Sequence, residues 1–99
     1  MAEVVSIVTG TVSSDGLQQV ADAYRSGLSE GPPPEIEETF LLEADGGRVA
    51  ILSVWHRRSG LEAMIASGEE PFARRVIREA GGSPEVTVYR IVQRAGSDD

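Results

Sequence analysis

Aliphatic and β-branched runs alternate with segments of helical periodicity along the chain. The run at residues 4–8 predicts a first strand. Polar residues at 13–15 can cap the start of a helix, and the apolar side chains that follow recur at helical spacing as far as Leu28. We expect this helix to end between Gly27 and Gly31, because the three prolines that come next cannot continue it.

Two more strands are predicted at residues 36–43 and 49–55. Asp45 and Gly46 lie between them, and glycine readily supplies the positive φ that a two-residue hairpin turn needs. These two strands are therefore expected to pair as an antiparallel hairpin.

A second helical region follows the hairpin. Ser59 and Glu62 have the spacing of a capping box, Gly68 interrupts the apolar periodicity, and Pro71 suits the first position of another helical segment. A last strand is predicted at residues 86–92. The order strand-helix-strand-strand-helix-strand predicts an α+β, ferredoxin-like βαββαβ fold with a four-stranded antiparallel sheet.

The third predicted strand is apolar on both of its faces. Side chains alternate between faces with period two, so one face carries Val49, Ile51, Ser53 and Trp55, and the other carries Ala50, Leu52 and Val54. A strand with this pattern is normally covered on both sides. Two helical regions cover only one face of the sheet, so we expect a second copy of the chain to cover the other as a homodimer, forming an α+β barrel. The alternative is a monomer with an exposed apolar face.

The length and composition bound the class of protein. A length of 99 residues suits one domain, which we expect to span residues 1–95 and to be followed by a polar tail at 96–99. No apolar stretch reaches the roughly 20 residues of a membrane span, and the start of the chain lacks the basic and apolar regions of a signal peptide. A cytoplasmic protein without a membrane partner is expected.

Charge and residue types exclude several chemistries. The formal net charge of −7 disfavours binding to nucleic acid. There is no cysteine, which excludes a thiolate nucleophile or metal site, and every basic residue is Arg, which excludes Schiff-base chemistry by Lys. His56 is the single histidine, and no spacing of His, Asp and Glu provides it with further metal ligands. We therefore expect neither a metal nor another cofactor.

Five features of the chain occur together: the order of elements, the strand that ends Ala50-Ile51-Leu52-Ser53-Val54-Trp55, the polar turn after it, the helix start near Ser59 and the later Phe72. In this combination the chain resembles the antibiotic biosynthesis monooxygenase family. The resemblance extends over nearly the whole chain. It implies a dimeric α+β barrel with a pocket between the helices and the sheet of each protomer. The family includes oxygenases that act without a cofactor on anthrone-like or quinol substrates, and also enzymes that degrade haem.

The resemblance also implies candidate site residues. Trp55 matches the tryptophan of the haem-degrading branch, whereas the positions of that branch's histidine and asparagine fall on Val76 and near Thr9. Neither valine nor threonine replaces the missing groups, so haem degradation is not implied. Tyr24 and Arg75 are the candidates for taking up a proton and for stabilising an anion. The substrate would also contact Thr9, Phe40, Met64, Phe72 and Val76.

Each candidate also has an ordinary structural interpretation. Trp55 can stack on an aromatic substrate, or it can close the end of a core strand. His56 is expected to be a solvated residue of the polar turn, and Arg74, Arg75 and Arg78 to share a solvated helix face or to clamp an anion. Two functions remain open. One is a cofactor-independent, monooxygenase-like enzyme for a small aromatic, and the other is a non-catalytic barrel that binds an apolar ligand or serves as an accessory protein.

Overall fold

One antiparallel sheet of four strands organises the molecule, as a computed structural model describes it for residues 2–31, 34–68 and 70–96. The sheet order is β2-β3-β1-β4, and the strands are β1 (Val4–Thr11), β2 (Ile36–Ala44), β3 (Arg48–Trp55) and β4 (Glu85–Arg90). The helices are α1 (Ser14–Ser29), α2 (Arg58–Ala66) and α3 (Phe72–Glu79). The predicted βαββαβ, ferredoxin-like fold is confirmed, and its second helical region consists of the two helices α2 and α3.

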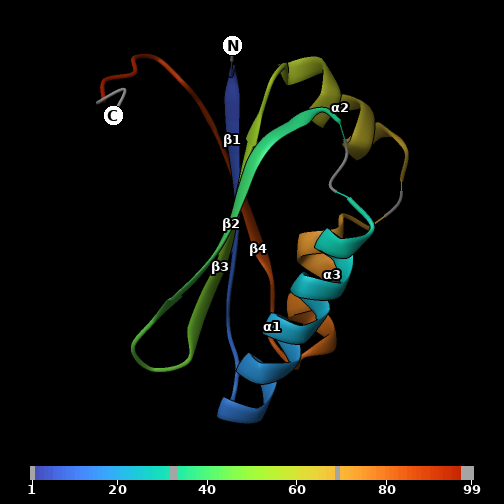
Figure 1. Ribbon diagram of the computed structural model, residues 1–99, viewed down its shortest axis with the longest axis vertical. Coiled ribbons are helices and arrows are strands. Elements are labelled where there is room, and N and C mark those ends of the chain that lie inside the picture. Colours follow the sequence, from blue (N-terminus) through green and yellow to red (C-terminus); the bar gives the residue numbers. More distant parts are fainter. Residues whose placement is uncertain (1, 32–33, 69, 97–99) are drawn as a thin grey trace.

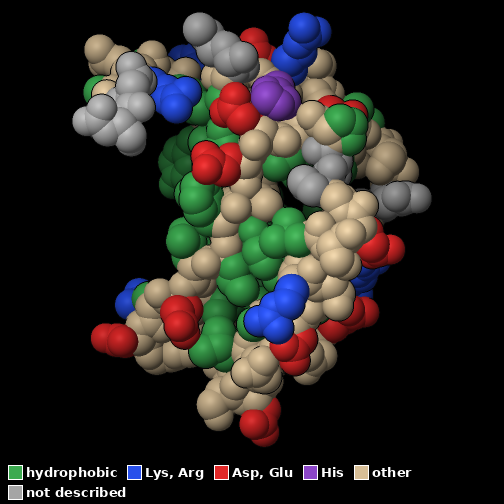
Figure 2. Space-filling model, viewed as in Figure 1, with side chains coloured by type: hydrophobic (Ala, Val, Ile, Leu, Met, Phe, Trp, Pro, Cys, Tyr) green, Lys and Arg blue, Asp and Glu red, His purple; other side chains and the backbone are tan. Residues whose placement is uncertain are grey.

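The three helices lie on one side of the sheet, and none covers the other side (Figure 1). The alternation predicted for β3 is confirmed: its side chains facing the helices are buried, whereas Ala50, Leu52 and Val54 on the opposite face are half-buried. Hydrophobic side chains are visible both between the sheet and α1 and along the helix-free side (Figure 2). The sheet therefore has one face that packs against helices and one apolar face that no helix of the described residues covers.

Side-chain oxygens accept hydrogen bonds from backbone N–H groups at the starts of α1 and α2. Ser13 caps α1 as expected, because its hydroxyl accepts a hydrogen bond from the N–H of Gly16 at 3.0 Å. The predicted capping box at Ser59 is wrong. Helix α2 already begins at Arg58, whose N–H donates to a carboxylate oxygen of Glu3 at 2.8 Å. The carboxylate of Glu3 thus accepts a hydrogen bond at the start of α2, where Ser59 was expected to cap the helix.

The hairpin between β2 and β3 is one residue longer than predicted. Ala44 pairs with Arg48, so the loop contains three residues, and both Gly46 and Gly47 have positive φ. Gly47 also approaches the chain closely, because a Cβ there would lie 2.2 Å from the carbonyl oxygen of Val12. Glycine is therefore required at this position for conformation and for space.

The core lies between the helices and the sheet. Its main cluster joins residues of β1, β3, α1 and α3, and includes Val20, Ile51 and Ile77. A smaller cluster of Val4, Trp55 and Leu61 fills the end of the sheet beneath α2. No helix in the described part of the chain is long and apolar enough to cross a membrane. Two of the predicted connector prolines, at 32–33, and most of the predicted tail, at 97–99, lie outside the described residues.

Candidate functional site

A cavity of about 460 Å³ lies between the sheet and the helices. Inward-facing residues of β1, β2 and β3 form its floor, and residues of all three helices form its walls. Leu28, Ile65 and Phe72 belong to this wall and remain exposed to solvent. Large apolar side chains that stay open around a concave site are typical of a binding surface for an apolar molecule.

Trp55 anchors the floor of the cavity at the end of β3. The side chain is only 3% exposed and packs against Val4 and Leu61, with Ile36 and Met64 beside it. Its indole nitrogen donates a hydrogen bond to the hydroxyl of Ser6 at 2.9 Å. The single polar group of the ring is therefore engaged within the protein, and what Trp55 offers to a ligand is carbon surface.

A row of three hydroxyl groups crosses the floor beside Trp55. Thr39 pairs with Ser53 across β2 and β3, and Ser53 pairs with Ser6 across β3 and β1. The side chains of paired residues lie on the same face of a sheet, here the face toward the helices. We call Thr39, Ser53 and Ser6 the hydroxyl row. It gives an otherwise apolar floor a narrow strip of neutral hydrogen-bonding groups.

Tyr24 of α1 connects the helix layer to this row. Its phenol donates to the hydroxyl of Thr39 at 3.2 Å, and the Thr39 and Ser53 hydroxyls are 3.3 Å apart. Among the side chains that the structure describes, no buried polar atom lacks a hydrogen-bond partner. The hydroxyl row is thus held at both of its ends by aromatic residues, Tyr24 at one and Trp55 at the other.

The wall near α3 combines an aromatic ring and a guanidinium group. The ring of Phe72 lies against α1 at Gly27, where a Cβ would come within 2.3 Å of the ring. The guanidinium carbon of Arg75 lies 5.7 Å from the centre of the same ring, a distance that suits a cation–π contact. None of the ion pairs between described residues includes Arg75. It lines the cavity together with the carboxylates Glu30 and Glu70, and its charge acts on Glu70 without pairing with it.

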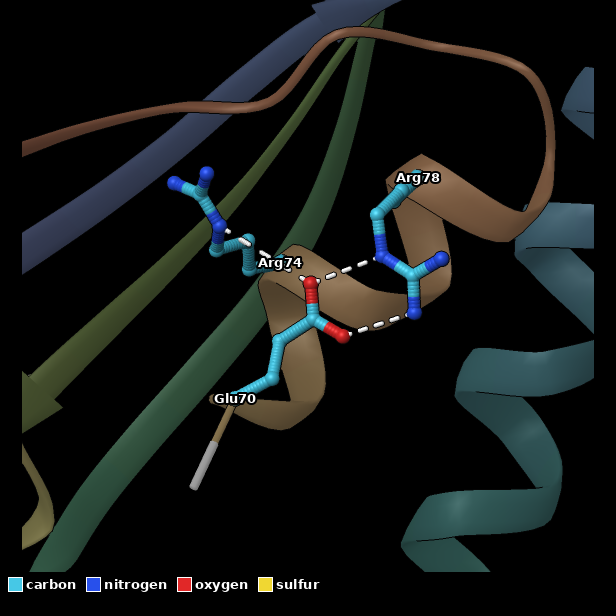
Figure 3. A network of polar contacts seen from close by, with 3 residues as sticks. All are labelled: Glu70, Arg74 and Arg78. Carbon is cyan, nitrogen blue, oxygen red and sulfur yellow. Dashed lines mark hydrogen bonds and ion pairs between the residues drawn. The ribbon is translucent and has the colours of Figure 1, made fainter. Parts of the chain in front are cut away.

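The neighbouring arginines have a different role. Arg78 donates two hydrogen bonds of 2.8 Å to the carboxylate of Glu70, and Arg74 lies 3.8 Å from the same carboxylate (Figure 3). The hydrogen bonds from Arg78 are the main cause of a lowered pKa at Glu70. This pairing fixes the segment before α3 to the body of that helix. The arginine cluster predicted from the sequence is therefore divided: Arg74 and Arg78 bind Glu70, and Arg75 lines the cavity.

The structure brings together five of the eight candidate side chains. The five that line the cavity are Tyr24, Trp55, Met64, Phe72 and Arg75. Thr9 and Phe40 do not line it, because they pair with Ala50 and Leu52 and so belong to the helix-free face of the sheet. Val76 does not line it either, because its side chain is buried in the main core cluster.

Sequence reasoning missed the hydroxyl row. The signal was present in the pattern: Ser6 and Ser53 are small polar residues at inward-facing positions of strands that are otherwise aliphatic. Thr39 was harder to find, since β2 is an edge strand on which polar residues are ordinary. A polar side chain on the buried face of a core strand is more informative than a polar side chain on an edge.

His56 lies outside this cavity. Its Nδ1 is 3.6 Å from a carboxylate oxygen of Glu37, and its side chain is well exposed. Among residues 2–31, 34–68 and 70–96, no group of three His, Asp or Glu side chains is arranged to hold a metal ion. The interpretation of His56 as a solvated residue of the turn agrees with this position.

A second hollow of about 660 Å³ lies near the β2–β3 hairpin. It is larger, but its wall includes backbone at Gly10 and Gly81 and contains no aromatic side chain among the described residues. Thr9 belongs to this wall. The cavity beside Trp55 is the better candidate site, because it combines aromatic side chains, a hydrogen-bonding strip and a guanidinium group that is in no ion pair among the described residues.

The sequence matches no family model and no curated protein. Solved structures do match. The protein NE2512 of unknown function from Nitrosomonas europaea superposes with a TM-score of 0.72 at 12% identity, covering 100% of this chain and 98% of that chain. A putative antibiotic biosynthesis monooxygenase from Deinococcus radiodurans gives 0.71 at 13% identity, covering 97% and 99%.

A third match is to an oxygenase of the same fold. The N63A mutant of SnoaB, a cofactor-independent oxygenase from Streptomyces nogalater, superposes with a TM-score of 0.69 at 13% identity and covers 96% of this chain and 98% of that chain. The chain has the fold of the antibiotic biosynthesis monooxygenases. The resemblance seen in the sequence is thus confirmed for the fold of the whole chain, and identities this low carry the fold alone.

Proposed function

We propose that the protein is a cofactor-independent, monooxygenase-like enzyme that oxidises a small, flat aromatic substrate of the anthrone or quinol type. The observation that carries this proposal is the open cavity beside Trp55. Its volume of about 460 Å³ is within the range of small-molecule sites. Had Trp55, Met64 and Phe72 filled this space, a purely structural role would have been favoured.

The reaction requires the substrate to supply the electrons. An anthrone loses a proton from its CH2 carbon to water in the open cavity, which leaves an enolate. The enolate reduces O2, and a proton returns to the reduced oxygen. A C–O bond forms at that carbon, the resulting hydroperoxide loses water, and the carbon becomes a carbonyl. One oxygen atom of O2 remains in the product and the other leaves as water, so no external reductant is needed.

The side chains that line the cavity match the needs of this chemistry. Trp55 forms part of the apolar floor against which a flat aromatic can lie. Arg75 supplies a positive charge that no carboxylate among the described residues neutralises by an ion pair, and such a charge stabilises an enolate. Tyr24 heads the hydroxyl row and can relay protons along it.

Oxygen consumption tests the function. Purified protein is mixed with anthrone or with a hydroquinone, and O2 uptake is recorded against the uncatalysed background in the presence of a metal chelator. We expect uptake that scales with protein concentration and one O2 consumed for each anthrone oxidised. If uptake equals the background with both classes of substrate, the enzymatic proposal fails and the non-catalytic ligand-binding role takes its place.

We further propose that the helix-free face of the sheet forms a homodimer. This face carries Phe40 and Tyr89, which are 42% and 57% exposed, beside the half-buried Leu52. Cross-strand pairing puts Phe40 opposite Leu52, and Tyr89 opposite Val5 on β1. An apolar surface that extends over all four strands is a liability in a monomer and is suited to a two-fold interface.

A further inference from the structure

The hydrogen bond from Tyr24 starts a chain of donation that can continue along the hydroxyl row, since either hydroxyl of the Thr39–Ser53 pair can be the donor. Each hydroxyl has one proton to donate and two lone pairs that accept. Thr39 accepts the proton of Tyr24, so its own proton is available to Ser53 at 3.3 Å. With Ser53 accepting from Thr39, the proton of Ser53 has no acceptor among the described side chains.

Ser6 has the same arrangement with a different donor. Its hydroxyl oxygen accepts from the indole N–H of Trp55 at 2.9 Å, and the proton of Ser6 has no acceptor in the described part of the chain. Ser6 and Ser53 are direct partners across β1 and β3, so their Cβ atoms are about 4.5–5.5 Å apart. Both side chains are only 7% exposed, and both line the cavity.

We infer that Ser6 and Ser53 form a two-donor site for an oxygen atom of the ligand, and that this site favours an enolate or phenolate oxygen over its protonated form. The inference rests on the proposed cavity and names the group that the cavity recognises. Two hydroxyl protons that converge on one point in a buried, apolar surrounding stabilise an oxyanion in the manner of an oxyanion hole. Donation from Tyr24 through Thr39, and from Trp55, polarises both hydroxyls toward the ligand.

The same geometry limits the class of ligand. A phenolate or enolate spreads its charge into an aromatic ring, and that ring can lie against Trp55 while its oxygen reaches the two serines. The neutral donors suit a single oxygen with delocalised charge better than a carboxylate, which needs a cation or more donors for its two oxygens. The expected ligand is therefore a fused-ring aromatic with a phenol or an enolisable ketone on one edge.

Binding of 2-naphthol tests this inference without turnover. The ionisation of 2-naphthol changes its absorbance, so a pH titration of the bound molecule under nitrogen gives its ionisation midpoint. We expect the midpoint of bound 2-naphthol to lie below that of the free molecule. In the Ser53→Ala variant, the preference for the ionised form should fall by about tenfold. The affinity for naphthalene, which has the same rings and no oxygen, should stay the same.

Two further variants separate the site from general folding effects. Ser53→Thr keeps a hydroxyl at the same position and should retain the preference for the ionised form. Ser59→Ala removes an exposed serine of α2 that does not line the cavity, and it should behave as the wild type. The inference is overturned if Ser53→Ala binds the ionised form as the wild type does, or if its affinities for 2-naphthol and naphthalene fall together.

The outcome is independent of the enzymatic proposal. If anthrone is not oxidised but the ionisation midpoint of bound 2-naphthol is lowered through Ser53, the two-donor site stands and the monooxygenase proposal fails. If anthrone is oxidised but Ser53→Ala leaves the midpoint unchanged, the enzyme stands and the two-donor site fails.

Discussion

The indole N–H of Trp55 donates a hydrogen bond to the hydroxyl of Ser6, 2.9 Å away and diagonally across β3 and β1. Both side chains are buried. The bond fixes the orientation of the ring at the floor of the cavity, and it removes the one polar atom of the ring from contact with a ligand. The position of the aromatic surface thus depends on a serine 49 residues away in the sequence.

Removing this serine should destabilise the protein more than its size suggests. Ser6→Ala leaves the buried N–H of Trp55 without an acceptor, which costs about 1–3 kcal/mol of the free energy of unfolding. In a Trp55→Phe background the same substitution should cost less, because no N–H remains to be satisfied. Urea unfolding of the four proteins in this cycle measures the difference. Equal costs in both backgrounds would show that the bond does not contribute.

Gly27 should be needed for the ring of Phe72 to pack against α1. Replacing an interior helix glycine with alanine normally stabilises a helix by about 0.5–1 kcal/mol. Here the added Cβ would lie 2.3 Å from the ring of Phe72, so Gly27→Ala should not stabilise the protein and should displace the ring from the cavity wall. In a Phe72→Ala background the ordinary gain should reappear. Thermal unfolding tests this, and a gain in both backgrounds would contradict the contact.

The Glu70 carboxylate should make stability depend on pH in the acid range. Its pKa lies below the ordinary value of 4.5, mainly because Arg78 hydrogen-bonds to it. Desolvation opposes this shift, and the charges of Arg78, Arg74 and Arg75 lower the pKa further. A carboxyl with a lowered folded-state pKa contributes stability above its unfolded value, and this contribution is lost as the pH falls through the folded value.

The matched variant is Glu70→Gln, which keeps the shape and removes the charge. We expect the wild type to be more stable than the variant above about pH 4.5, with a small difference because the pair is exposed and screened by salt. The difference should shrink as the pH falls below 4.5. Unfolding curves collected across this range measure it, and a difference that grows toward acid pH would have the wrong sign.

The helix-free face should control the oligomeric state. Leu52 lies at the centre of this face between Ile7 and Phe40. Leu52→Glu would bury a charge in the proposed interface and should weaken the dimer by about a hundredfold or more. Light scattering coupled to size-exclusion chromatography reports the mass. A monomeric wild type would refute the interface, and Glu62→Gln on exposed α2 is a control that should stay dimeric.

Much of the fold could be predicted because its signals are local. The alternation along β3 defines two faces without reference to any other strand, and Ser13 marks the start of α1 through a bond within its own turn. The start of α2 could not be predicted in this way. It depends on Glu3, which is 55 residues from Arg58 in the sequence and meets it only in the folded chain.

The candidate site was predicted in part for the same reason. Trp55 and Phe72 are large, apolar and of residue types that are rare in this chain, so they are easily recognised in the sequence. The hydroxyl row is not recognisable in the sequence, because only the register of three strands brings Ser6, Thr39 and Ser53 side by side. Phe40 looks like a pocket residue from its type alone, and only strand pairing shows that it belongs to the other face of the sheet.

The most direct measurement of the central claim compares oxygen uptake by the wild type and by Trp55→Phe and Trp55→Ala with anthrone as substrate. The wild type should consume oxygen above background, Trp55→Phe should retain part of that rate because a flat ring remains, and Trp55→Ala should lose at least about tenfold in kcat/KM, since the stacking surface is gone. Circular dichroism confirms that each variant is folded. Full turnover by a folded Trp55→Ala protein would contradict the account.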